Sequence, residues 1–117
     1  MNNRQIGAMG EEIAKNYLIE NEFSILEQNY RNKIGEIDII AKKQNEIVFV
    51  EVKSRNNLNY GYPSEAVNIK KQFKILNTSK IYILANNLNN NKLRYDVIEV
   101  YLKNNNINHI ENAFWSN

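Results

Sequence analysis

Three side chains near the middle of the sequence could carry out chemistry together: Asp38, Glu51 and Lys53. They belong to two apolar runs separated by the polar segment Lys42 to Glu46, a pattern that predicts two strands joined by a turn. Because side chains alternate across a strand, Glu51 and Lys53 share one face. If the turn closes a hairpin, Asp38 lies beside Glu51 on the neighbouring strand.

Two carboxylates that meet at the end of an apolar sheet repel each other unless a proton or a cation lies between them. Oxygen ligands without thiols favour Mg²⁺ or Mn²⁺. Lys53 would then offset charge on a phosphate or orient a water, so the set suits metal-assisted phosphodiester hydrolysis. The alternative is an ordinary ion pair on a half-exposed strand, and a Glu-x-Lys triplet alone does not exclude it.

The sequence around these residues resembles a known family. The runs GEIDII, at residues 35–40, and VFVEVKSR, at residues 48–55, resemble the YraN family, which is identified as a member of the PD-(D/E)XK, or restriction-endonuclease-like, superfamily. In that superfamily the acid of one strand and the Glu-x-Lys of the next are the metal and catalytic positions. The resemblance therefore implies these roles for Asp38, Glu51 and Lys53.

A further acidic residue, Glu11, precedes the predicted hairpin. Residues 4 to about 21 have the apolar spacing of a helix, with Glu11 at the border of the apolar stripe and Glu12 pointing away from it. An acid in the first turns also favours the helix itself, which is the alternative explanation of Glu11. Related nucleases place an acidic metal ligand here, so the resemblance implies that Glu11 and the Val52 carbonyl join the two strand carboxylates around Mg²⁺ or Mn²⁺.

Three other residues are candidate contacts to nucleic acid. Arg55 follows Lys53 by two positions, so it points to the same side of the strand and could contact a phosphate. Lys71 and Gln72 coincide with a Lys-Gln pair of the YraN family, which implies a role near the phosphate backbone. Lysines on a helix more commonly form a solvated face, and that remains the alternative.

The remaining pattern predicts an α/β domain. A strand is expected before the hairpin, a second helix from Ser64 toward Ala85 with a possible break at Asn77 to Ser79, and a last strand over Lys92 to Leu102. Phe114 and Trp115 are expected to cap the core. This order, αβββαβ, predicts a mixed central β-sheet flanked by helices. The resemblance implies the restriction-endonuclease-like core, similar to archaeal Holliday-junction resolvases.

Asp96 and His109 also lie in segments that resemble the family. Asp96 belongs to the run Arg94 to Val97, and we interpret it as a structural hydrogen-bonding group, with distant support of the site as the alternative. His109 lacks the spacing of a metal ligand, so a structural role is expected for it as well.

Composition sets the remaining limits. The chain has 117 residues, 43% of them hydrophobic, with no cysteine and a net charge of +2. This predicts one domain over residues 1–117 and excludes disulfides and thiolate metal sites. No stretch is apolar enough to span a membrane, and the polar start is unlike a secretory signal, so we expect a cytoplasmic protein without a membrane partner.

These observations predict a Mg²⁺-dependent endonuclease acting on DNA, with branched or junction DNA as one candidate substrate and a homodimer as one candidate arrangement. The alternative is a module of the same fold that binds nucleic acid without cutting it. A third hypothesis is a small interaction protein that dimerises through its terminal aromatic residues. The sequence contains no P-loop and no nucleophile elbow, which argues against nucleotide hydrolysis and acyl transfer.

Overall fold

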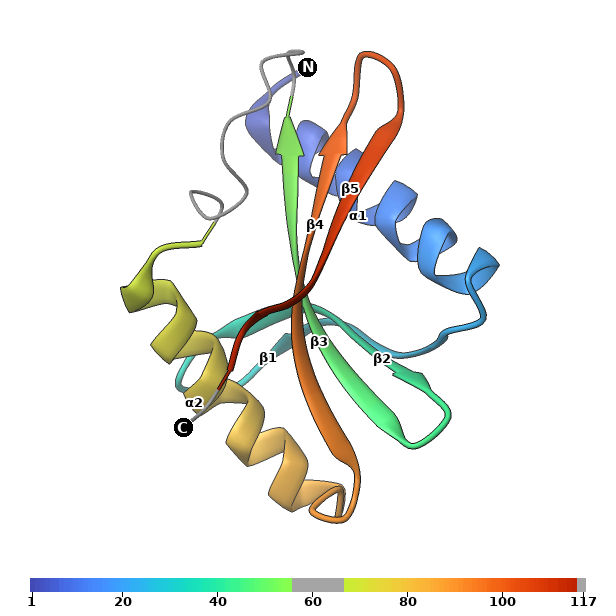
Figure 1. Ribbon diagram of the computed structural model, residues 1–117. Helices are drawn as coiled ribbons and strands as arrows, with labels where there is room; N and C mark the ends of the chain where they lie inside the picture. The colour runs from blue at the N-terminus through green and yellow to red at the C-terminus, as the bar shows by residue number, and fades with distance from the viewer. Residues whose placement is uncertain (56–66, 116–117) are drawn as a thin grey trace.

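The computed structural model describes residues 1–55 and 67–115. Its elements are α1 (Asn3–Glu20), β1 (Ser24–Arg31), β2 (Glu36–Lys43), β3 (Glu46–Arg55), α2 (Ile69–Ala85), β4 (Lys92–Tyr101) and β5 (Asn106–Phe114) (Figure 1). The predicted α/β class with a mixed sheet is confirmed and is compatible with a restriction-endonuclease-like core. The order is αβββαββ, with one strand more than expected.

The five strands form one sheet in the order β1-β2-β3-β4-β5. Strands β3 and β4 are parallel, and every other neighbouring pair is antiparallel. A parallel pair needs a long connection that crosses the sheet, and α2 lies within it. Figure 1 shows the strong twist of the sheet, with α1 and α2 at different sides of it.

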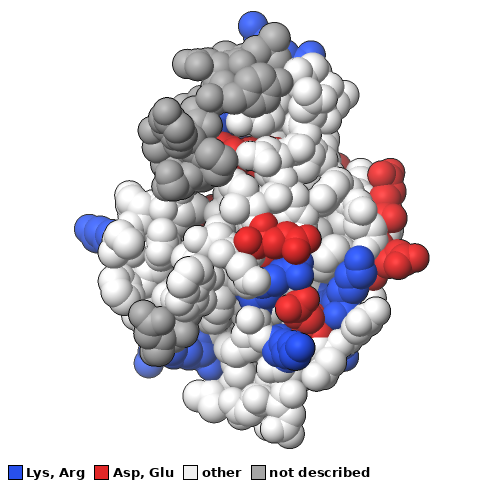
Figure 2. All heavy atoms as spheres, in the orientation of Figure 1, with Lys and Arg blue, Asp and Glu red and all other residues white. Residues whose placement is uncertain are grey.

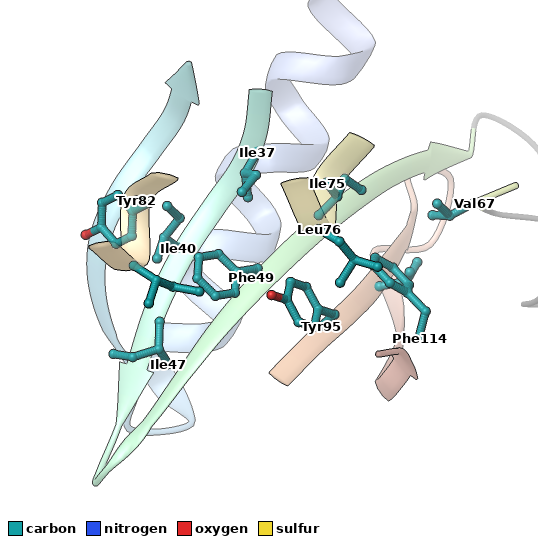
Figure 3. Close-up of a cluster of buried hydrophobic side chains, with 12 residues drawn as sticks. Ile37, Ile40, Ile47, Phe49, Val67, Ile75, Leu76, Tyr82, Tyr95 and Phe114 are labelled. Atoms are coloured by element: carbon teal, nitrogen blue, oxygen red, sulfur yellow. The ribbon is translucent and has the colours of Figure 1, made fainter. Parts of the chain in front are cut away.

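The face of the sheet toward α2 carries an aromatic core. Phe49 stacks on Tyr95 with ring centroids 5.2 Å apart, and Tyr95 stacks on Phe114 at 5.5 Å. Figure 3 shows these rings beside Ile75 and Leu76 of α2. Rings packed at these separations bury large areas and hold β3, β4 and β5 together.

The opposite face packs against α1. Ala14 and Leu18 of the helix contact a cluster that includes Val48, Val50 and Val52 of β3. The predicted alternation along β3 is therefore confirmed, and the odd-numbered positions from 49 to 55 point toward the α2 side.

Helix α2 differs in detail from the prediction. It begins after Asn68, whose side chain accepts a hydrogen bond from the Lys71 backbone at 2.9 Å, while the predicted cap, Ser64, lies outside the described residues. The helix continues through the expected break because Thr78 and Ser79 donate their hydroxyls to carbonyls of the preceding turn, at 2.7 Å each. Hydroxyls bonded in this way do not compete with the helix ladder.

The end of the chain also corrects the prediction. Phe114 is buried as expected, but Trp115 is 67% exposed and does not cap the core. Strand β5 was missed because its sequence is rich in Asn and only half-buried, so it lacks the apolar alternation of a typical strand. Its pairing with β4 defines it.

No helix in residues 1–55 or 67–115 has both the length and the apolar character needed to cross a membrane.

Candidate active site

The site begins where β2 and β3 separate. The antiparallel ladder between them ends at the pair Ile39 and Val50. Beyond that pair, the Val52 backbone N–H donates to the Asp38 side chain, with 2.8 Å between nitrogen and Oδ2. The carboxylate of Asp38 therefore fills the opening between the two strands, in place of a backbone carbonyl.

This hydrogen bond also orients the Val52 carbonyl. In an extended strand the N–H and C=O of one residue point to the same side. Because the Val52 N–H points to Asp38, the Val52 C=O points into the same opening. The Val52 carbonyl oxygen, which the family resemblance implies as a metal ligand, thus lies on the same side as the carboxylates.

Glu51 comes from the last buried part of β3, and its exposed fraction is only 7%. Burial, together with a hydrogen bond to Asp38 and repulsion from it, raises the pKa of Glu51 to about 8, although Lys71 acts in the opposite direction. The predicted meeting of the Asp38 and Glu51 carboxyl groups is therefore present. A buried acid that faces another acid resists ionisation unless a cation compensates it.

Glu11 reaches the same region from α1. At Gly10 the helix lies so close to β3 that an added Cβ would be 1.8 Å from the Ser54 Oγ. This contact brings the next residue, Glu11, toward the sheet, and the pKa of Glu11 is raised to about 7 by burial, by Asp38 and by Glu36. The predicted orientation of Glu11 is confirmed. Its neighbour Glu12 is exposed.

Lys53 and Arg55 follow Glu51 on the same side of β3. Lys53 is half-buried and lies opposite Glu99 in the ladder with β4. The Arg55 guanidinium donates from Nε and Nη2 to Glu99 Oε2, at 3.2 and 2.9 Å. Glu99 is fully buried and also accepts from Asn108 at 2.9 Å. Arg55 therefore belongs to an ion pair, and any contact with phosphate must use its remaining N–H groups.

The two predicted contacts on α2 differ from each other. Lys71 Nζ lies 3.4 Å from Glu51 Oε1, so Lys71 is part of the site. Gln72 donates from Nε2 to the Val67 carbonyl at 3.1 Å, which secures the first turn of α2. The structure therefore brings Lys71, and not Gln72, into contact with the acidic residues.

A pocket of about 390 Å³ opens beside Asp38 and Glu51. Lys71 and Lys74 of α2 line it, together with Arg31 and Lys33 from the end of β1 and the connection to β2. Sequence reasoning missed the part of Arg31, Lys33 and Lys74 in this pocket. The only signal was a positive charge on each, which many surface residues share.

Asn32 builds the wall of this pocket by holding the β1–β2 connection against α2. Its Nδ2 donates to the Tyr30 hydroxyl at 3.0 Å and to the Thr78 carbonyl at 3.2 Å, and its Oδ1 accepts from the Ile34 backbone at 3.0 Å. Gly35 then passes so close to α2 that an added Cβ would lie 2.9 Å from Thr78 Oγ1. A side chain at this position would push the connection away from the helix.

The charged residues of the site form two groups, an acidic floor of Glu11, Asp38 and Glu51 and a basic rim of Arg31, Lys33, Lys71 and Lys74. Elsewhere, Figure 2 shows acidic and basic side chains next to one another on the face in view, so charge of one sign does not cover it. With a net charge of only +2, attraction to a polyanion would have to come from local groups such as this rim. Within the described ranges, no three Asp, Glu or His side chains are already closed around one point as metal ligands.

Asp96 and His109 form a separate cluster on the α1 side, which we call the Asp96 cluster: Tyr17, Glu46, Arg94, Asp96 and His109. Asp96 is fully buried and accepts from Arg94 Nε and Nη2, each at 2.9 Å. His109 Nε2 lies 2.7 Å from Asp96 Oδ2, and His109 Nδ1 lies 2.9 Å from the Tyr17 hydroxyl. The structural hydrogen bonding expected of Asp96 and His109 is present.

Comparison with known proteins places the chain in a family. Residues 10–100 match the model of the Uncharacterised protein family UPF0102. The chain belongs to this family. The matched range contains every residue of the acidic floor and of the basic rim, and the family includes YraN, so the resemblance noted in the sequence is confirmed at this level.

Relatives within UPF0102 match along almost their whole length. The UPF0102 protein of Clostridioides difficile strain 630 is 59% identical over 114 residues, which cover 97% of this chain and 100% of the relative. That of Alkaliphilus oremlandii is 52% identical over 116 residues, or 96% and 99% of the two chains. That of Caldanaerobacter subterraneus subsp. tengcongensis is 47% identical over 119 residues, covering 97% and 98%. These names give a family and no activity, so function has to be argued from the site.

Proposed function

We propose that this protein is a PD-(D/E)XK-type nuclease that uses Mg²⁺ or Mn²⁺ to hydrolyse phosphodiester bonds in DNA. The observation that carries the proposal is the meeting of the Asp38 and Glu51 carboxyl groups where β2 and β3 separate, with Glu11 of α1 close enough for Asp38 to raise its pKa. Asp38 and Glu51 come from the separating ends of β2 and β3, and Glu11 comes from α1. A fold gains no stability by gathering like charges, so such a group suggests a function.

The donor chemistry of these residues fits a hard divalent cation. Three carboxylates and the Val52 carbonyl supply the oxygen ligands that Mg²⁺ and Mn²⁺ prefer. Burial and repulsion from Asp38 raise the pKa values of Glu11 and Glu51, and a bound cation would offset both effects. The metal, when bound, polarises the phosphate and makes a bound water more acidic.

The basic residues would act on the substrate. Lys53, on the same side of β3 as Glu51, orients the attacking water or offsets charge that develops on the phosphate. Lys71, Lys74 and the N–H groups of Arg55 that do not donate to Glu99 bind the neighbouring backbone phosphates. Gln72 supports this surface indirectly because it holds the first turn of α2.

We place DNA, including branched or junction forms, as the substrate, and the cytoplasm as the compartment. Base-edge readers are not needed for such substrates because phosphate contacts can recognise shape. A twofold homodimer would allow both strands to be cut symmetrically.

The second candidate function is a module that binds nucleic acid without cutting it. The observation that favours it is the ion pair between Lys71 and Glu51, which already compensates part of the acidic charge without a metal. In that case Asp38, Glu51 and Lys71 form a structural network, and the basic rim alone contacts nucleic acid.

The test is cleavage of labelled linear, nicked, flapped and four-way DNA with Mg²⁺ or Mn²⁺. We expect metal-dependent cutting that Asp38→Ala and Lys53→Ala each reduce by about a thousandfold or more, equivalent to about 4 kcal/mol of transition-state stabilisation. Glu11→Ala should lose most of the activity. Its matched control, Glu12→Ala, changes an exposed acid of the same helix and should cut normally.

Binding without cutting, unchanged by metal, would overturn the nuclease and favour the second candidate. Equal losses in Glu11→Ala and Glu12→Ala would show that the loss at position 11 is unrelated to its place in the site. Folding of each variant is checked by its thermal unfolding curve.

A further inference from the structure

The contact between Lys71 and Glu51 joins a half-exposed cation to a buried acid. The exposed fraction of the Lys71 side chain is 45%, whereas that of Glu51 is 7%, and Nζ lies 3.4 Å from Oε1. The lysine therefore reaches in from the surface on a flexible stem. A long lysine side chain can withdraw into solvent without a change in the backbone.

The backbone that carries Lys71 is held in place. The Lys71 N–H donates to the Asn68 side chain at 2.9 Å, at the first turn of α2. Lys74, one helical turn farther along, lines the same pocket. The two lysines thus present similar charges to one pocket from one helix, but the ion pair to Glu51 is formed by Lys71.

We propose that Lys71 and the divalent cation occupy Glu51 in turn, and that the cation displaces Lys71 into the pocket, where it binds a phosphate of the substrate. This inference rests on the proposed function, because it assumes that the carboxylates bind metal. It adds an exchangeable lysine that takes the place of the metal at Glu51 until the metal arrives.

The exchange follows from charge and distance. An ammonium and a divalent cation on the same carboxylate repel each other strongly at a separation of a few ångströms, since the acid is buried and solvent screens the pair poorly. A directly coordinated divalent cation holds a carboxylate more tightly than one ammonium does, so Lys71 is the group that leaves. Once free, its charge remains beside the pocket with Arg31, Lys33 and Lys74.

The exchange would have two consequences. The protein can fold without metal, because Lys71 compensates Glu51 in the meantime. Metal binding must also displace Lys71, so the lysine lowers the affinity of the site for the cation. Removing the lysine should therefore tighten metal binding, which is the opposite of what is expected for a residue that supports the site.

The experiment measures Mn²⁺ affinity without using activity. Free Mn²⁺ is followed by electron paramagnetic resonance while the full chain is titrated at one fixed pH, which is the same for every variant. We expect Lys71→Gln to tighten Mn²⁺ binding about five- to tenfold, within the range of ordinary coupling between two sites. Lys71→Arg, which keeps the charge, should stay close to the wild type.

Lys74→Gln is the matched control. It removes one positive charge from the same pocket and the same helix without touching the ion pair to Glu51, so we expect a change of about twofold or less. Equal effects of Lys71→Gln and Lys74→Gln would overturn the exchange and leave only a general electrostatic effect. Weaker binding by Lys71→Gln would overturn it as well, while the proposed metal site would stand.

A different outcome would test the proposed function itself. If the wild type and all three variants fail to bind Mn²⁺ at millimolar concentration, both the metal site and the exchange are overturned. Because 45% of the Lys71 side chain is exposed, we expect the variants to fold, and thermal unfolding curves would verify this.

Discussion

Two regions of this protein bury carboxylates, and they shift the pKa values of these groups in opposite directions. In the Asp96 cluster, burial alone would raise the pKa of Asp96, but hydrogen bonds from His109, Arg94 and the Asn112 backbone outweigh it and lower the pKa. In the candidate active site, burial and the neighbouring Asp38 raise the pKa of Glu51 to about 8. One acid is surrounded by donors, and the other faces another acid.

A missing hydrogen-bond partner does not explain this difference. Among the described residues, no buried side-chain nitrogen or oxygen lacks a hydrogen-bond partner. The acidic floor is therefore short of positive charge and not of hydrogen bonds. The Asp96 cluster is complete as a structural network, whereas the candidate active site would be completed by a cation.

The largest expected effect comes from breaking the Asp96 cluster. Asp96→Asn removes the charge that pairs with Arg94, whose side chain is only 11% exposed. Arg94 keeps Glu46 at 2.8 Å, but the variant loses the buried carboxylate that both Arg94 and His109 bind. Loss of a buried ion-pair partner is costly, so the free energy of unfolding should fall by about 3 kcal/mol. Urea unfolding followed by circular dichroism measures it.

Asp38→Asn is the matched control for this change. It retains an oxygen that can accept from the Val52 N–H and removes one of the meeting charges, so stability should change by less than about 1 kcal/mol. Similar losses in the two variants would mean that the regions do not differ as described.

The next effect is a dependence of stability on pH. A carboxyl whose pKa is raised by folding binds its proton more tightly in the folded state, so its stabilisation is complete below the ordinary value of 4.5. That stabilisation is lost as the pH rises through about 7 for Glu11 and about 8 for Glu51. We expect unfolding free energy to fall on the order of 2 kcal/mol between these limits.

Added Mg²⁺ should restore part of this loss, because it binds the ionised carboxylates of the folded state. Urea midpoints measured across the pH range, with and without Mg²⁺, test both statements. A stability that increases steadily from pH 4.5 to mildly alkaline conditions would contradict the assignment of raised pKa values to this site.

A smaller effect is expected for Glu51→Gln. The amide cannot ionise, so the variant should be more stable than the wild type by about 1 kcal/mol at alkaline pH and equal to it in acid. Metal-dependent cleavage should be lost at the same time. A variant that gains stability while losing activity would mark Glu51 as a functional residue, and loss of both would mark it as structural.

The smallest effect is expected at the edge of the Asp96 cluster. Tyr17→Phe removes one hydroxyl bonded to His109 Nδ1 and should reduce stability by about 0.5 to 1 kcal/mol. Cleavage should be unaffected, because Tyr17 is not among the residues that line the pocket beside Asp38 and Glu51. A strong loss of cleavage would show that the two regions are coupled.

Much of the acidic floor could be predicted because it depends on local rules. The alternation along β3 and the short turn before it determine that Asp38 and Glu51 face each other, since neighbours in a hairpin are close in sequence. The helical period likewise directed Glu11, and not Glu12, toward the sheet. The Asn-rich strand β5 and the exposure of Trp115 were not predicted, because local composition says little about pairing at a sheet edge.

Contacts between residues far apart in the sequence could not be predicted in this way. The partner of Arg55 is Glu99, on a strand that follows α2, and the partner of the Asn32 amide is the Thr78 carbonyl on that helix. Any of several acids or carbonyls would have satisfied these donors equally well. The parallel pairing of β3 with β4 selects Glu99, and the packing of α2 on the sheet selects Thr78.

The sequence by itself determined which reactive side chains lie together, because residue type and strand period place Asp38, Glu51 and Lys53 at one end of a hairpin. The tertiary structure decided which other residues surround these side chains. It brought Lys71 to Glu51 and turned the β1–β2 connection into the wall of a pocket. These contacts join residues far apart in the chain, and they exist only when the helix and the sheet bury their apolar faces against each other.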